Sequence, residues 1–227
     1  MGPAVSAERA SGTADLPRTV PIFPLSGALL LPRGQLPLQI FEPRYLAMTR
    51  DALAGDRMIG MIQPRRPERI DPGDCPEVFA IGCLGRITAF SETGDGARLF
   101  ITLTGVGRFE LERELPALRG YRRAAVRYER FARDLAPEAG DRPLDRKRLL
   151  MALRGYLAQK GAAVDESALE SLGDEPLVTK LAMVLPFEPG EKQALLECAG
   201  LGERGRVLTS LLEMALAGGA DAPARPQ

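Results

Sequence analysis

The chain has 227 residues, of which 45% are hydrophobic and 26% are charged, as is ordinary for a globular protein. Basic and acidic residues both number 30, so the formal net charge is zero and the chain lacks the positive excess typical of nucleic-acid-binding proteins. There is no histidine, which excludes Ser-His-Asp triads, Cys-His pairs and histidine-ligated zinc.

Cysteine usage and the lack of long apolar runs bear on the compartment. No two of the three cysteines, Cys75, Cys83 and Cys198, have the Cys-x-x-Cys spacing. This predicts free thiols in a reducing environment and no zinc or redox site. The first twelve residues lack the apolar segment of a signal peptide, and no apolar run reaches the roughly 18 residues of a membrane-spanning helix. We therefore expect a cytoplasmic protein without membrane contact, metal or cofactor.

Short apolar runs, punctuated by proline, follow a lead-in at residues 1–16 that lacks periodicity and is expected to be disordered. Such runs are typical of short strands in a sheet or barrel, and this pattern continues to residue 133. Gly82, Gly85, Gly105 and Gly107 interrupt the runs without the spacing of a phosphate-binding loop, so we expect them at bulges, bends or close backbone approaches. The expected strands lie around Ile22–Phe23, Leu29–Leu31, Leu36–Phe41, Arg57–Gln63, Val78–Phe90, Arg98–Leu103, Arg108–Glu112 and Tyr121–Phe131.

One helix interrupts the strands. Pro43 suits a first helical position, apolar residues from Tyr45 to Leu53 recur at helical spacing, and Gly55 suits the end of the helix. Glu42, just before the helix, is expected to accept N–H groups of the first turn and to pair with Arg44 or Arg108. We interpret Glu42, Arg44, Tyr45 and Arg108 as a structural junction, with a recognition site as the alternative.

The character of the chain changes at a polar linker, residues 134–142. Apolar stripes at helical spacing fill residues 143–217 and must bury themselves against one another, which predicts a helical bundle. Residues 218–227 are expected to form a disordered tail. The sequence thus predicts an α+β protein with a β-rich first part, residues 17–133, and an all-helical second part.

Several motifs resemble one known family. The segments Pro21-Ile-Phe-Pro-Leu25 and Leu36-Pro-Leu-Gln-Ile-Phe-Glu-Pro-Arg-Tyr45 strongly resemble the N-terminal substrate-recognition domain of Lon proteases, the LON domain. Ile81–Ile87, Leu103–Phe109 and Leu177–Leu196 resemble its later strands and helices, so the resemblance spans about residues 18 to 217. It implies a PUA-like β pseudobarrel with one or two helices, followed by a C-terminal helical bundle. Leu31, Arg33 and Gln39 stand where the family often has Phe, Gly and His.

The resemblance and the missing motifs together indicate a non-catalytic binding module. There is no Walker-type phosphate loop, and the four lysines are expected on helix surfaces, which argues against a Ser-Lys dyad. The resemblance implies that the partners are unfolded or exposed polypeptide segments, or a partner protein. Candidate contact residues at strand edges are Phe23, Leu29 and Leu31, with burial in the core as the alternative. The lysines are Lys147, Lys160, Lys180 and Lys192.

Two other functions remain open at this point. A basic run interleaved with Tyr121, Tyr128 and Phe131 would suit an RNA-binding PUA-like module, although the net charge of zero favours a solvated strand face. An enzyme that acts through carboxylates would combine Glu42 with Asp71 or Asp74 in one cleft. Oligomeric state is not predicted. The arginines of the run are Arg119, Arg122, Arg123, Arg127, Arg130 and Arg133.

Overall fold

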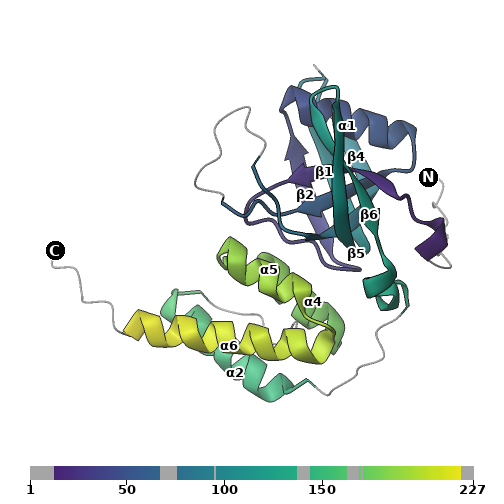
Figure 1. Ribbon diagram of the computed structural model, residues 1–227. Helices are drawn as coiled ribbons and strands as arrows, with labels where there is room; N and C mark the ends of the chain where they lie inside the picture. The colour runs from purple at the N-terminus through teal and green to yellow at the C-terminus, as the bar shows by residue number, and fades with distance from the viewer. Residues whose placement is uncertain are drawn as a thin grey trace. The chain divides into compact units, whose positions relative to one another are not determined.

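The predicted α+β class is confirmed (Figure 1). The computed structural model describes residues 13–66, 76–94, 96–136, 144–162, 169 and 171–220. These residues fall into two compact units, each described by itself below. The barrel unit takes the described residues up to Pro24, Leu30–Ile62 and those from Val78 to 136. The helical unit takes Leu25–Leu29, the described part of Gln63–Glu77 and the rest of the chain.

Six strands form one mixed sheet in the barrel unit. Their order is β2-β5-β4-β3-β1-β6, and β6 also pairs with β5, so five strands close into a ring while β2 lies outside it. Only β1 and β3 run parallel; the other pairs are antiparallel. The strands are β1 (Thr19–Pro24), β2 (Gln35–Ile40), β3 (Met58–Ile62), β4 (Ile81–Glu92), β5 (Leu99–Leu118) and β6 (Tyr121–Arg127).

Alternating side chains from the ring of strands fill the barrel core. Val20 and Ile22 of β1, Leu84 of β4 and Phe109 of β5 are all fully buried in one apolar cluster. Their period of two along each strand is the reason that the short apolar runs predict strands. Leu16 is also buried in this cluster, so the chain enters the core before the predicted boundary at residue 17.

The glycines permit close approaches and one of the two register shifts between β4 and β5, as predicted. A Cβ on Gly82 would lie 2.4 Å from the Phe109 ring, and one on Gly105 would lie 2.0 Å from the carbonyl oxygen of Leu31. The register of β4 on β5 shifts between Leu84 and Gly85. Because Gly105 lets another segment pass close by, β5 continues through it as one strand where the sequence suggested two.

Three sequence predictions about local structure need correction. Leu29–Leu31 does not form a strand, and its leucines are nonetheless buried. The predicted linker begins too early, because Asp134 and Leu135 belong to a 3-10 helix, η3 (Glu129–Leu135). Another short 3-10 helix, η1 (Thr13–Asp15), lies inside the predicted disordered lead-in. Residues 1–12 and 137–143 lie outside the described residues.

Helix α1 (Pro43–Ala54) lies against β1, β3 and β6 at one end of the barrel (Figure 1). Pro43 occupies the first turn and Gly55 is the C-cap residue, as predicted. Tyr45 and Met48 on its inner face are buried, and the Tyr45 ring lies 4.2 Å from the ring of Phe23 on β1. The helix therefore covers apolar side chains of the sheet on the face that its periodicity predicts.

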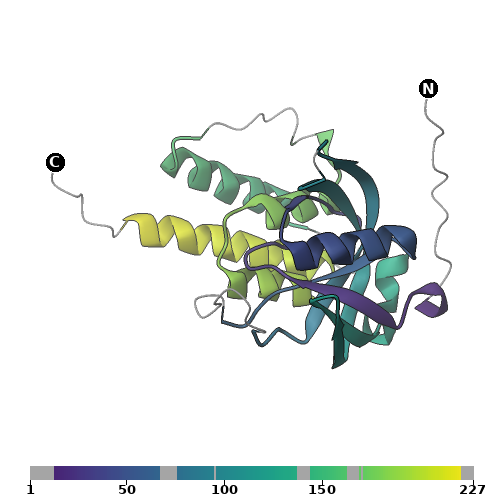
Figure 2. The same ribbon diagram turned by 90° about the horizontal axis from the view of Figure 1, so that it is seen from above.

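Four helices make up most of the helical unit. In both views of the ribbon, α2 and α6 run side by side (Figures 1 and 2). Leu149 and Leu153 of α2 and Leu208 and Leu212 of α6 are buried, which confirms the predicted stripes. The last helix runs to Ala220, beyond the predicted end at 217. The helices are α2 (Arg146–Gln159), α4 (Asp174–Val184), α5 (Pro189–Glu197) and α6 (Leu201–Ala220).

Candidate functional site

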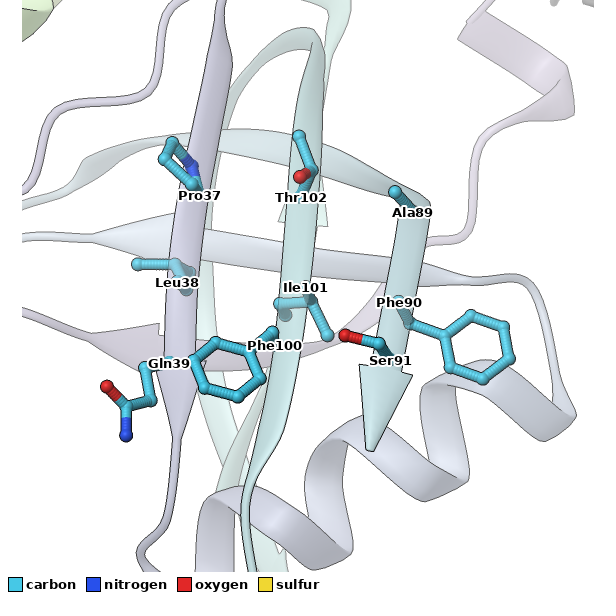
Figure 3. A pocket seen from close by; sticks show the side chains of 9 residues that line it. All are labelled: Pro37, Leu38, Gln39, Ala89, Phe90, Ser91, Phe100, Ile101 and Thr102. Atoms are coloured by element: carbon cyan, nitrogen blue, oxygen red, sulfur yellow. The ribbon is translucent and has the colours of Figure 1, made fainter. Parts of the chain in front are cut away.

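The candidate site is a groove on the outside of the barrel unit, across β2, β5 and β4 (Figure 3). It has a volume of about 430 Å³, and none of its lining residues is charged. We call it the outer groove. Its lining residues are Pro37, Leu38 and Gln39 of β2, Phe100, Ile101 and Thr102 of β5, and Ala89, Phe90 and Ser91 of β4.

Strand alternation decides which side chains face outward here. Along β5, Leu99, Ile101 and Leu103 are buried, whereas Phe100 is 44% exposed. Gln39 pairs with Phe100 across β2 and β5, so both side chains lie on the outward face. In Figure 3 the Phe100 ring lies towards Gln39, and the Phe90 ring projects on the far side of β4.

Two more exposed phenylalanines lie on or next to the strands of the outer groove. Phe90 is 55% exposed, and Phe41, which directly follows β2, is 62% exposed. Thr88 and Thr104, whose hydroxyl oxygens lie 3.0 Å apart, are the nearby polar groups on β4 and β5. Phe100 stands at a position that alternation assigns to solvent, whereas Phe90 pairs with the buried Ile101 and so lies on the other face of the sheet. This arrangement can bind apolar groups, and its lining residues offer no acid, base or thiol for catalysis.

The predicted contact residues are elsewhere. Phe23, Leu29 and Leu31 have exposed fractions of 5%, 2% and 0%, which agrees with the core alternative. The sequence analysis does not identify Phe90 and Phe100 as contact residues, because it predicts only strands for the runs that contain them. The signal was present in the sequence. Phe100 occupies the same set of alternate positions as Thr102 and Thr104, and these positions face away from the buried side chains of β5.

The predicted junction forms only in part. Arg44 donates to Glu42, with Nε and Nη2 lying 3.1 Å and 2.9 Å from Oε2, as one of the two expected pairs. Glu42 is the N-cap residue of α1, but its side chain makes no capping hydrogen bond, contrary to expectation. The Arg44 guanidinium also lies 4.7 Å from the centre of the Tyr45 ring. The Glu42 carboxylate is thus occupied by Arg44 in place of helix N–H groups.

Arg108 has a different partner from the one expected. Its Nε and Nη2 donate to the carboxylate of Asp134 at 2.9 Å and 2.8 Å, and its backbone N–H donates to the same carboxylate at 2.9 Å. Both side chains are buried, and the guanidinium lies 4.3 Å from the Phe131 ring centre. Arg33, at φ 63°, donates to the Asp134 carbonyl at 2.7 Å. Arg108 therefore anchors η3, which sequence reasoning had assigned partly to a linker.

Most arginines of the basic run are paired with carboxylates of the barrel unit. Arg119 pairs with Asp51, and Arg123 donates to the carbonyl of Pro116 at 3.0 Å. Glutamates on β5 pair with Arg122 and Arg127 of β6 and with Arg130 of η3, so much of the basic character of β6 is compensated by its neighbouring strand. These pairs are Arg122 Nε to Glu114 at 2.8 Å, Arg127 to Glu112 at 3.0 Å and Arg130 to Glu110 at 3.0 Å.

Lys192 is not a helix-surface residue, unlike the other three lysines. It is buried in α5, and its ammonium group donates to the carbonyl oxygens of Gly27 at 2.7 Å and Met183 at 3.3 Å. Burial lowers the pKa of this amine. Gln63 accepts from the Gly27 N–H and donates to the Pro189 carbonyl. These bonds explain why Leu25–Leu29 and Gln63 join the helical unit, where a continuous barrel segment was predicted.

The enzyme alternative finds no constellation in the part of the chain that the structure describes. Asp71 and Asp74 lie outside the described residues, and Glu42 is bound to Arg44. No group of three or more potential metal ligands occurs among the described residues. Within the same residues, no helix is long and apolar enough to span a membrane.

Comparison with known proteins decides the family. The family model of the ATP-dependent protease La (LON) substrate-binding domain matches residues 19–214. The chain belongs to this family. Its predicted resemblance to LON domains is thereby confirmed over nearly the same residues.

The relatives of this LON domain are longer proteins. Lon protease 2 of Myxococcus xanthus is 28% identical over 87% of this chain, and Lon protease of Anaeromyxobacter dehalogenans is 27% identical over 93% of it. The LON domain chain spans about a quarter of the length of these curated relatives, 24% in both cases.

Solved structures support the fold of this LON domain. A Lon N-terminal domain protein from Xanthomonas campestris is 26% identical, with a TM-score of 0.56 over 86% of this chain and 97% of the other. The N-terminal domain of a Mycobacterium avium complex Lon protease has a TM-score of 0.58 over 86% of this chain and 98% of the other. At 17% identity, it shows the fold alone.

Proposed function

We propose that this LON domain is a non-catalytic module that binds unfolded or exposed polypeptide segments in the outer groove. The observation that carries the proposal is an uncharged groove with exposed aromatic side chains, in a chain whose family is a substrate-binding domain of a protease. Unfolded polypeptides expose the apolar side chains that folded proteins bury, so such a groove suits them.

Two further observations support a binding role over a catalytic one. The lining residues provide apolar side chains, amides and hydroxyl groups, and the chain contains no histidine that could act as a general base. The Lon-named relatives supply the substrate class, since a protease acts on polypeptides. The proposal extends this class to the present chain.

Fluorescence anisotropy with a labelled unfolded protein tests the proposal. We expect reduced, carboxymethylated α-lactalbumin to bind with a dissociation constant in the micromolar range, and native α-lactalbumin not to bind. Phe100→Ser should weaken binding at least fivefold, since truncation of a central aromatic contact typically costs more than about 1 kcal/mol.

Met151→Ser is the matched control, because Met151 is 64% exposed on α2 in the helical unit. It should leave binding unchanged. The proposal is wrong if the unfolded protein does not bind, or if the two variants weaken binding equally. Hydrolysis of the labelled protein by the purified chain would contradict the non-catalytic part.

A further inference from the structure

We propose that the polypeptide binds as an added β-strand beside the outer groove, with an extended, uncharged segment paired along the open edge of β2. This inference rests on the proposed function and specifies the conformation and composition of the segment that is bound. Strand addition gives affinity through main-chain hydrogen bonds and specificity through alternate side chains.

Among the described residues, the topology leaves β2 with a free edge. The barrel closes through the second half of β5, where Glu110–Leu118 pairs with β6, while the first half of β5 carries β2. In the described sheet order, β2 is therefore the strand with one neighbour. Its side chains are also accessible: of its six residues, Ile40 alone is buried.

The direction of the backbone groups follows from one hydrogen bond. The Gly34 carbonyl accepts from the Gly105 N–H at 2.8 Å, so this carbonyl points towards β5. Because these directions alternate along an antiparallel strand, Leu36, Leu38 and Ile40 also point towards β5. The backbone groups of Gln35, Pro37 and Gln39 therefore point away from β5. They offer three carbonyl acceptors and two N–H donors to an incoming chain, because proline has no N–H.

The lining of the groove selects the chemistry of the occupant. None of the lining side chains carries a charge that could compensate a buried charge on the segment. An added strand would continue the face that holds Pro37, Gln39 and the Phe100 ring, and its opposite face would meet the half-buried Leu36 and Leu38. An apolar, uncharged segment fits both faces.

A second copy of this chain is a poorer occupant than an unfolded segment. Pairing of two β2 edges would bring together two strands that both lack the N–H of Pro37. Proline on an edge strand is a common device against such self-pairing. A segment with all its N–H groups can satisfy the three outward carbonyls of β2, which a copy of β2 would not.

Backbone N-methylation separates strand addition from simple apolar docking. The probe is a fluorescein-labelled peptide in which phenylalanine and leucine alternate with threonine between Ser-Gln ends. Two methylated versions carry N-methyl groups on complementary sets of alternate residues. Only one set faces β2 in an added strand, so we expect one version to bind at least tenfold more weakly and the other to bind like the parent peptide.

A substitution in the protein provides the second arm. The Gln39 N–H points away from β5, so Gln39→Pro removes a donor from the open edge and leaves the β2–β5 ladder intact, as Pro37 already does. We expect Gln39→Pro to bind the parent peptide at least fivefold more weakly than Gln39→Ala, because both variants lose the glutamine side chain and only Gln39→Ala keeps the N–H. Circular dichroism and thermal melting check that both variants fold.

Each outcome has a distinct meaning. If both methylated peptides bind equally and Gln39→Pro binds normally, strand addition is overturned, while sensitivity to Phe100→Ser would still support the proposed function. If neither peptide nor unfolded protein binds, the proposed function fails as well. Concentration-dependent dimers that Gln39→Pro abolishes would assign the edge to a second copy and overturn the inference.

Discussion

The Asp134 carboxylate accepts three hydrogen bonds from Arg108, one from its backbone and two from its side chain. Both side chains are buried, and the guanidinium is stacked on Phe131. A buried pair of this kind adds little to stability compared with apolar residues of the same size, but loss of one partner leaves a buried charge uncompensated. The pair therefore matters most for the position of η3.

Asp134→Ala should lower the free energy of unfolding by about 3–5 kcal/mol, because Arg108 would remain buried without its carboxylate. Glu110→Ala is the control: it removes the partner of Arg130, whose side chain is 54% exposed, and should cost less than about 1 kcal/mol. Urea denaturation at neutral pH measures both. Equal losses would mean that Arg108 becomes hydrated when Asp134 is removed.

Strand β5 organises the barrel unit at the level of elements. Its first half pairs with β2 and β4 and its second half with β6, so one strand of 20 residues both closes the ring and carries the appended β2. The segment just before β2 crosses β5 at Gly105. There the backbone N–H of Arg33 donates to the Gly105 carbonyl at 2.8 Å. Gly105 is thus a point of close contact between β5 and the segment that precedes β2.

Gly105→Ala should destabilise the protein by about 3 kcal/mol or more, because its Cβ would lie 2.0 Å from the Leu31 carbonyl oxygen. The matched substitution is Gly107→Ala on the same strand. Its Cβ would meet Leu135 at 3.5 Å, an ordinary contact, so the change should stay within about 1 kcal/mol. Urea denaturation compares the two variants. Similar stabilities would show that the crossing segment moves aside easily.

Charge is balanced over the whole chain, where basic and acidic residues both number 30, and it is also compensated locally on the barrel. Glutamates of β5 face arginines of β6 and η3, with Glu112 to Arg127 at 3.0 Å and Glu110 to Arg130 at 3.0 Å. Phosphate binding needs arginines whose charge is not already compensated, since affinity for RNA comes largely from the release of counterions. The basic run therefore does not amount to a positive surface.

A single-stranded RNA of mixed sequence should not bind the wild-type chain at micromolar concentration in 150 mM salt. The double variant Glu112→Gln and Glu114→Gln should gain binding that weakens steeply with added salt, because it leaves Arg122 and Arg127 without their carboxylates. Asp56→Asn with Glu77→Gln changes the net charge equally elsewhere and should not. Tight RNA binding by the wild-type chain would favour the RNA-binding alternative.

Local pattern accounts for most of the elements. The proline-broken apolar runs, Pro43 and Gly55 around α1, and the leucine stripes of the later helices all predict structure correctly, because backbone geometry alone decides which side chains share a face. The exception at Leu29–Leu31 is instructive. A buried apolar run needs no strand when its backbone finds partners elsewhere, and periodicity carries no information on this point.

By itself, the sequence determined the α+β order of barrel and bundle, the glycines at close approaches and the family. Only the tertiary structure decided that Arg108 meets Asp134, that Lys192 is buried against Gly27, and that Phe100 lines a groove beside an open strand edge. These contacts join residues that lie far apart in the chain or on separate strands. They depend on strand register and helix packing, which are set by the fit of the whole core and not by any local run of residues.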